Sequence, residues 1–293
     1  MFKPLLCLLS AVVLLSSITP VIKYVFQHSD MHPIGMAGLR VLIGFFFLLP
    51  ITLLWDRRGG KALAAADTVK LTLLGLLGVA SYAIAAWGLL YTSVTHYILI
   101  YSLIPSFTTM FSVLWGKEQV RPLKLAGILI SFIGCVIAIS EGVQDFGTSS
   151  EIGDGFVLLF TIMMAAHIVL SSGIVKHVRA LPANTWMFGS SSLMLSLLIL
   201  SLGAMGWPGP PHDNFPPLTI ALVVYVGGAT AAVFLLRYLS LRSLTPMTVG
   251  VYHNLVPVCT ILLAYLFLGE GVGGSTIVGG VTIIAGAEFV RRA

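Results

Sequence analysis

The chain has 293 residues, of which 57% are hydrophobic and only 9% are charged, and its formal net charge is +5. A soluble domain needs roughly 25% charged residues to cover its surface, so this composition excludes an ordinary water-soluble protein. The mean hydropathy of +1.00 indicates instead an outer surface that faces lipid.

Ten continuous apolar runs follow one another along the chain, and each is long enough to cross a bilayer, for which a helix needs about 20 residues. Lipid offers no hydrogen bonds, so these runs must form helices or a closed barrel. Their continuous, non-alternating hydrophobicity favours helices. The expected fold class is therefore an all-α membrane protein with ten transmembrane helices. The predicted spans are residues 4–27, 33–55, 68–90, 94–115, 122–141, 154–178, 184–206, 217–240, 245–268 and 273–290.

The basic residues gather on one side of this topology, as the positive-inside rule describes. If the N-terminus is cytoplasmic, the outer side keeps only Lys23. The inner side then holds Lys3, Arg57, Arg58, Lys61, Lys70, Lys117, Arg121, Lys124, Lys176, Arg179, Arg237, Arg242, Arg291 and Arg292. This bias predicts a multi-pass protein of the inner cell membrane with both termini in the cytoplasm. Because topology accounts for the scattered charges, no nucleic-acid partner is expected.

The first three spans carry polar residues at unusual depth. Pro20 cannot donate a backbone hydrogen bond, so it frees the carbonyl of Ser16 and marks a bend that we expect to act in gating. Arg40 must find carbonyls, an acidic partner, water or an anionic substrate. Contact with a substrate carboxylate and a purely structural role both stay open for it. Tyr82 is deep enough in the third span to line a substrate cavity.

Residues 102–118 (SLIPSFTTMFSVLWGKE) and 254–270 (NLVPVCTILLAYLFLGE) share one pattern. A shift of 152 residues pairs Pro105 with Pro257, Glu118 with Glu270, Gly127 with Gly279 and Gly134 with Gly286. The shift corresponds to five spans, and since five is odd, the second copy enters the membrane in the opposite orientation. The sequence therefore predicts two inverted five-helix repeats, residues 1–141 and 153–293. This architecture is typical of secondary transporters with a substrate site at the midplane.

Each repeated proline removes a hydrogen bond to the carbonyl four residues earlier. Those carbonyls belong to Tyr101 and His253, which the same shift pairs. We expect Tyr101 and His253 to face a central substrate cavity, with Ser102, Tyr252 and Asn254 close by. The two prolines would then break their helices and act in gating. The alternative is that they kink the helices only for packing.

His167 lies in the middle of the sixth span, where an ionisable residue is expensive and is a functional candidate by default. A proton-coupling or substrate-binding role and a neutral ring bonded to a helix carbonyl both stay open. The serines at 190–192, with His167 or His253 as a base, have the residue types of an intramembrane hydrolase. Nothing in their spacing brings them together, so no enzyme activity is expected.

No metal or cofactor pattern is visible in the sequence. Cys7, Cys135 and Cys259 all fall within predicted spans and are expected to be free thiols. The glycines of the fifth and tenth spans mark close-packing helix faces. These faces are expected to serve either packing within the chain or a homodimer contact.

With these features the chain resembles the EamA repeat of the drug/metabolite transporter superfamily. The resemblance rests on the paired Pro and Glu residues of the two halves, on Arg40 in the second span and on Lys23 at the end of the first. Leu15 and Ser16 stand where the family usually has a Trp-Gly pair. The resemblance implies two EamA halves of five helices that work by alternating access, driven by a gradient rather than by ATP.

The family moves amino acids, sugars, nucleotide conjugates and drugs. We therefore expect a secondary transporter in the lipid bilayer that binds a small molecule, and export of an amino acid or a related metabolite is the preferred function. A drug transporter or a sugar or nucleotide-conjugate transporter of the same fold is the main alternative. A receptor or scaffold that transports nothing is less favoured.

Overall fold

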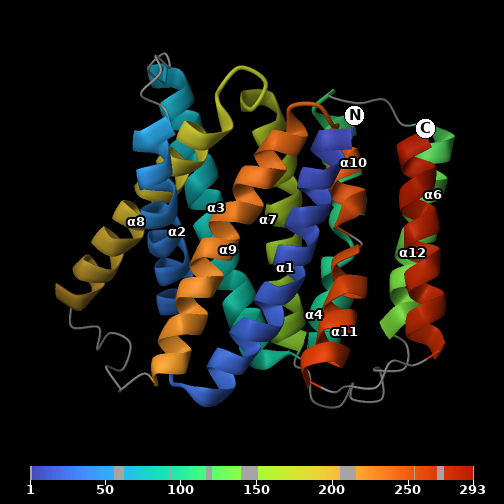
Figure 1. Ribbon diagram of the computed structural model, residues 1–293, viewed down its shortest axis with the longest axis horizontal. Helices are drawn as coiled ribbons and strands as arrows, with labels where there is room; N and C mark the ends of the chain where they lie inside the picture. Colours follow the sequence, from blue (N-terminus) through green and yellow to red (C-terminus); the bar gives the residue numbers. More distant parts are fainter. Residues whose placement is uncertain are drawn as a thin grey trace.

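The computed structural model of the chain describes residues 2–55, 63–92, 94–116, 121–139, 151–204, 216–253, 255–268 and 274–292. Within these ranges the chain is almost entirely helical and holds no strand, which confirms the all-α class. The helices are α1 (Phe2–His28), α2 (Pro33–Trp55), α3 (Ala65–Tyr91), α4 (Val94–Tyr101), α5 (Ile104–Leu114), α6 (Pro122–Ile139), α7 (Glu151–Ile174), α8 (Ala180–Ala204), α9 (Pro217–Leu241), α10 (Pro246–Tyr252), α11 (Leu255–Leu268) and α12 (Gly274–Arg292). They stand side by side in one bundle, with both chain termini at the same edge (Figure 1).

The fourth and ninth predicted spans are each built from two short helices, α4 with α5 and α10 with α11. The break is complete rather than a kink. Pro105 occupies the first turn of α5, and Pro257 lies two residues after the start of α11. A proline is tolerated in a first turn because the backbone N–H there has no partner within the helix. The repeated prolines therefore begin the second half of each broken span.

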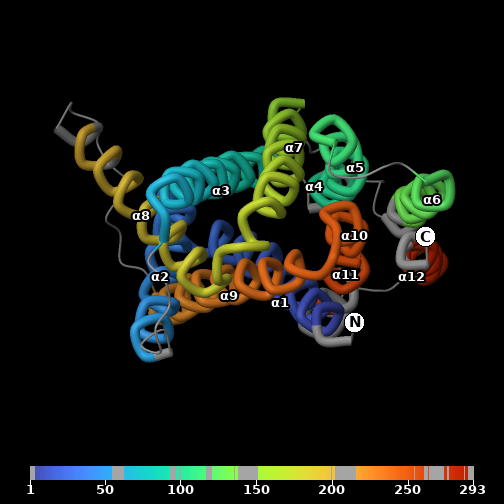
Figure 2. Tube along the Cα trace, turned by 90° about the horizontal axis from the view of Figure 1, so that it is seen from above, coloured from blue at the N-terminus to red at the C-terminus, as the bar shows by residue number. Residues whose placement is uncertain are grey.

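The helix contacts repeat when the two halves of the chain are exchanged. α1 packs on α9 as α7 packs on α3, and α2 packs on α9 as α8 packs on α3. α1 also packs on α11 as α7 packs on α5, and the equivalent helices α6 and α12 pack on each other (Figure 2). α1 begins at the edge that holds the termini, whereas α7 begins at the opposite edge (Figure 1). The fold is thus a pair of inverted five-helix repeats.

The contact between α6 and α12 shows this symmetry at atomic scale. A Cβ atom on Gly134 would lie 2.7 Å from the backbone nitrogen of Ile283, and one on Gly286 would lie 2.6 Å from the backbone nitrogen of Ser131. The Ser131 hydroxyl also reaches the Ile283 carbonyl at 3.4 Å across a separation of 152 residues. The small faces predicted from sequence are used for packing within the chain, and a homodimer contact stays a prediction.

The outside of the bundle is apolar, as a lipid-facing surface requires. Of the helices described, α1, α2, α3, α7 and α9 are individually long and apolar enough to cross a membrane. Exposed leucines cover the outer face of α8, where Leu193, Leu197, Leu198 and Leu200 are each at least half exposed.

Candidate functional site

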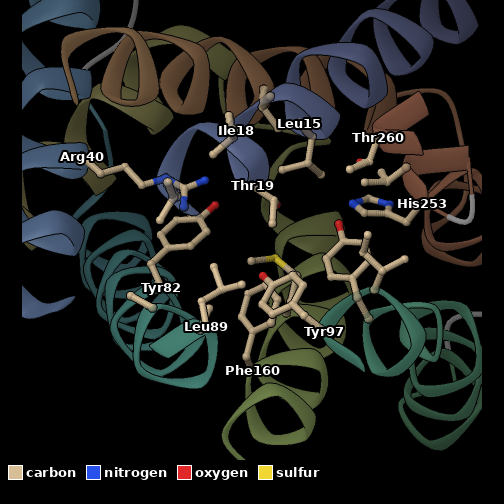
Figure 3. A pocket seen from close by; sticks show the side chains of 18 of the residues that line it. Leu15, Ile18, Thr19, Arg40, Tyr82, Leu89, Tyr97, Phe160, His253 and Thr260 are labelled. Carbon is tan, nitrogen blue, oxygen red and sulfur yellow. The ribbon is translucent and has the colours of Figure 1, made fainter. Parts of the chain in front are cut away.

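A cavity lies at the centre of the bundle, between the two broken spans and the helices α1, α2, α3, α7 and α9 (Figure 3). Most of its wall is apolar. The polar side chains that line it are Thr19, Arg40, Tyr82, Tyr97, Tyr101, Arg237, His253 and Thr260.

Most of the cavity lies in the half of the bundle away from the chain termini, and Val233 and Arg237, near the C-terminal end of α9, extend its wall toward the termini. Its lining residues on α1 run from Leu15 to Ile22, in the C-terminal half of that helix, and those on α2 run from Met36 to Arg40, near its start. α3 contributes residues from Tyr82 to Leu89, near its C-terminal end. These three helix ends share the edge opposite the termini (Figure 1).

On the side of the termini, α3 closes tightly on α8. A Cβ atom on Gly75 would lie 2.6 Å from the carbonyl oxygen of Met187. The ring N–H of Trp186 donates to the Thr72 hydroxyl at 3.0 Å, which ties the same two helices together. α3 and α8 are therefore in close contact on this side of the bundle in the conformation described.

An aromatic wall crosses the cavity at the helix breaks. The rings of Tyr101 and His253 lie 6.3 Å apart, so the structure brings together the two residues that the sequence repeat pairs. Tyr97 and Phe160 stack beside Tyr101, with ring centroids 6.2 and 6.0 Å from it. Sequence reasoning missed both rings, because neither stands near a proline or a repeat motif.

The His253 ring presents a hydrogen-bond acceptor to the cavity. Its Nδ1 bonds to the Val249 carbonyl at 2.8 Å. Because a carbonyl only accepts, Nδ1 carries the proton, and Nε2 of the neutral ring is left as an acceptor.

Arg40 reaches from α2 into the cavity (Figure 3). Its guanidinium carbon lies 3.8 Å above the centre of the Tyr82 ring, and its Nε donates to the Thr230 hydroxyl. The side chain is only 6% exposed. A cation over an aromatic face is stabilised by roughly 2 kcal/mol when water is excluded. This arrangement holds Arg40 at the wall while its terminal nitrogens stay available to a ligand.

Arg237 corrects one sequence expectation. The charge analysis counted it among the residues of the inner side, but the structure places it in α9, 2% exposed, at the cavity wall. Its guanidinium carbon lies 4.2 Å from the centre of the Phe234 ring. The Tyr82 and Phe234 rings lie 6.0 Å apart and are themselves separated by 152 residues. Two cations thus stack on two repeat-equivalent rings that touch.

His167 does not line the cavity but lies behind Arg237. Its Nδ1 is 3.4 Å from a terminal nitrogen of Arg237 and 3.2 Å from the hydroxyl of Ser171. The guanidinium can only donate, so Nδ1 accepts from it and the ring is neutral with its proton on Nε2. The bonding partner is therefore a cation, not the helix carbonyl that the sequence suggested.

Two of the carbonyls that the prolines were expected to free, those of Ser16 and His253, both accept hydrogen bonds. The Ser16 carbonyl, which Pro20 deprives of its helical partner, accepts a hydrogen bond from the Thr260 hydroxyl at 3.2 Å. α1 continues through Pro20 without a break. The His253 carbonyl is not free, because the N–H of Val256 donates to it at 3.0 Å and closes a tight turn.

The remaining predicted site residues lie around the breaks. Ser102 and Tyr252 are buried beside the two breaks, outside the cavity wall. Pro257 lines the cavity, whereas Pro105 is buried in the packing of α5. Asn254, together with the paired glutamates Glu118 and Glu270, lies outside the described residues.

The serine cluster of α8 serves its own helix. The hydroxyls of Ser190 and Ser191 donate to the Met187 carbonyl, and that of Ser192 donates to the Gly189 carbonyl. Neither His167 nor His253 lies among their described partners. Cys7 and Cys259 are free thiols, and the side chain of Cys135 lies outside the described residues. In the described part of the chain, no group of His, Cys, Asp and Glu side chains could hold a metal ion.

The chain is similar to several transporters over most of its length. It is 28% identical over 264 residues to an uncharacterized transporter of Archaeoglobus fulgidus, a match that covers 88% of this chain and 87% of that protein. It is 22% identical over 260 residues to an S-adenosylmethionine uptake transporter of Rickettsia conorii, which covers 89% of this chain and 83% of that protein. A solved crystal structure shares its fold, with a TM-score of 0.80 over 100% of this chain and 99% of that one at 18% identity.

The family comparison agrees with the internal symmetry of the fold. The model of the EamA-like transporter family matches this sequence twice, over residues 2–140 and again over residues 151–292. Proteins of this family and the relatives above are named as transporters and not as enzymes. Two consecutive matches that together span nearly the whole chain establish that this multi-pass membrane transporter belongs to the EamA-like transporter family.

Proposed function

We propose that this transporter exports an amino acid or a related carboxylate-bearing metabolite across the inner membrane by alternating access. The observation that carries the proposal is the cavity at the two helix breaks, where a buried cation and an aromatic wall face one another. S-adenosylmethionine, named for the Rickettsia conorii relative, is itself an amino-acid derivative, although that relative is named for uptake.

The chemistry of the wall suits the three parts of an amino acid. The carboxylate would bind the terminal nitrogens of Arg40, because charge-assisted hydrogen bonds to guanidinium are about twice as strong as neutral ones. The ammonium would donate to the free Nε2 of His253 and lie against the tyrosine rings, which attract cations. The side chain would pack on Leu89, Phe160 and their apolar neighbours.

The symmetry of the contacts supports alternating access. Gly75 of α3 packs against α8 on the side of the termini, and Gly227, its equivalent after 152 residues, packs against α2 with a would-be Cβ atom 2.6 Å from the Ile43 Cβ. Both contacts are closed in the conformation described, and their equivalent construction is compatible with a cycle in which each opens in turn.

Purified protein in liposomes provides the test. We expect faster exchange of radiolabelled amino acids across the bilayer than in protein-free vesicles. Decarboxylated analogues, such as phenethylamine in place of phenylalanine, should exchange at least ten times more slowly because they lack the group that binds Arg40. Equal rates for an amino acid and its amine would contradict carboxylate recognition. In cells preloaded with the labelled substrate, faster efflux would support export, and faster accumulation would support uptake instead.

A further inference from the structure

Arg237 has an unusual environment for a buried arginine. One terminal nitrogen donates to the sulfur of Met164 at 3.3 Å and the other reaches Nδ1 of His167 at 3.4 Å. Its Nε is buried without any hydrogen-bond partner in the described structure. A thioether is a weak acceptor, and the contact with the imidazole is long. Its five N–H donors therefore make only two poor hydrogen bonds, and none to an anion.

The charge of the cavity is also unbalanced. Arg40 and Arg237 both line it, and no Asp or Glu belongs to its described lining. A buried charge without a counterion is strongly destabilising, because the desolvation cost of the cation is not repaid. The ring stacking of each guanidinium repays only part of that cost. A ligand that brings two negative charges would complete the site.

Arg237 is also unlike an arginine that only cross-links helices. A structural arginine satisfies its donors on carbonyls or carboxylates, whereas Arg237 leaves them for a ligand. His167 is a positioning residue for Arg237, because its Nδ1 accepts a hydrogen bond from one terminal nitrogen of the guanidinium and so fixes the orientation of that group. Arg237 stacks on Phe234 and Arg40 stacks on Tyr82, so the two cations lie on adjoining rings.

We propose that Arg237 is a second anion-binding residue of the cavity, and that the preferred cargo carries two carboxylates, one for each arginine. This inference rests on the proposed transport function and narrows its substrate class to small dicarboxylates, acidic amino acids included. The first carboxylate binds Arg40. The second replaces the weak contacts of Arg237 with a two-pronged hydrogen-bonded pair, the geometry that guanidinium and carboxylate favour.

Matched ligands test the proposal on the unmodified protein. Glutamate and glutamine differ only in the charge and donors of one group, as do glutarate and its monoamide. Their ability to compete for exchange in liposomes, and to raise the melting temperature of the purified protein, gives their relative affinities. We expect each dicarboxylate to bind at least tenfold more tightly than its amide. Amides that bind as well as the acids, or better, would overturn the proposal whatever the variants show.

Variants then assign the effect to Arg237. Arg237→Gln should reduce the acid-to-amide ratio to about one, whereas Arg237→Lys should retain part of the preference through its charge. The control is Arg242→Gln, because Arg242 is exposed just beyond the end of the same helix, and its ratio should be unchanged. An unchanged ratio in a folded Arg237→Gln protein would refute the role of Arg237.

Different results would reject the transport function and the preference for dicarboxylates. Exchange of zwitterionic amino acids without preference for a second carboxylate would reject the dicarboxylate inference and leave the transport function intact. Lack of exchange for every carboxylate compound would reject the proposed function itself.

Discussion

Tyr101 and His253 occupy the same position in the two halves of the chain, and their rings meet at a centroid distance of 6.3 Å beside the breaks of the two discontinuous spans. Both rings line the central cavity and are largely buried. We therefore expect a cargo that fills the cavity to contact this pair.

Removal of both rings should disable the cavity. We expect the double variant Tyr101→Ala, His253→Ala to lose at least tenfold in exchange rate, because the aromatic wall and the acceptor of His253 vanish together. Stacked aromatic pairs contribute about 0.5–1.5 kcal/mol beyond their burial. The matched control is Tyr91→Ala at the exposed end of α3. Normal exchange in the double variant would refute the proposed site.

Arg40→Gln should weaken binding of the cargo rather than slow the conformational cycle. A charged hydrogen bond contributes about 1.5–3 kcal/mol, so the half-saturating substrate concentration should rise roughly ten- to a hundredfold. Lys70→Gln removes a charge from the exposed face of α3 and should leave binding unchanged. If Arg40→Gln retains the original affinity, Arg40 has a structural role.

Gly134→Ala and Gly286→Ala should each destabilise the protein, and the two substitutions should do so to a similar extent. An added Cβ atom would press on the backbone of the partner helix in either case, and overpacking of this kind costs about 1–3 kcal/mol. Gly155→Ala is the matched control, because a Cβ atom there meets nothing within 4 Å. Thermal melting in detergent should show two lowered midpoints and one unchanged or raised. Unequal effects of the two equivalent glycines would contradict the symmetry of the α6–α12 contact.

His167→Gln should preserve any dependence of transport on a pH gradient. The groups that face His167 are Arg237, Ser171 and the Phe234 ring, and a second proton on the ring would set two cations against each other at 3.4 Å. A glutamine oxygen can accept the same hydrogen bond from Arg237, whereas His167→Leu cannot and should weaken binding of the cargo. Loss of gradient dependence in His167→Gln alone would instead make His167 a proton carrier.

Single cysteines at positions 118 and 270 should react with a membrane-impermeant reagent from opposite faces of the membrane. The background chain would have Cys7, Cys135 and Cys259 replaced by serine or alanine. The inversion of the second repeat requires this result, and reaction of both positions from one face would contradict the topology.

Sequence reasoning predicted the fold, and it predicted the two helix breaks that border the central cavity, because both depend on strong local signals. Apolar length gave the spans, and the repeated prolines gave the two breaks. It missed Arg237 because the residue lies four positions before the end of α9, where a basic side chain ordinarily reaches the interface. It missed Tyr97 and Phe160 because the direction of a side chain in an apolar helix depends on the packing of other helices.

The chain meets itself at three places along one line: Tyr82 faces Phe234, Tyr101 faces His253, and Ser131 faces Ile283. In a two-fold symmetric dimer of identical five-helix polypeptides, each of these residues would have faced its own twin. Every mutation there would have acted twice, on both sides at once. In this single chain the two repeats differ in sequence, and unlike residues stand opposite each other at all three places. A molecule in the central cavity therefore meets Tyr101 from one repeat and His253 from the other. This difference between the two sides of the cavity suits the recognition of an asymmetric compound.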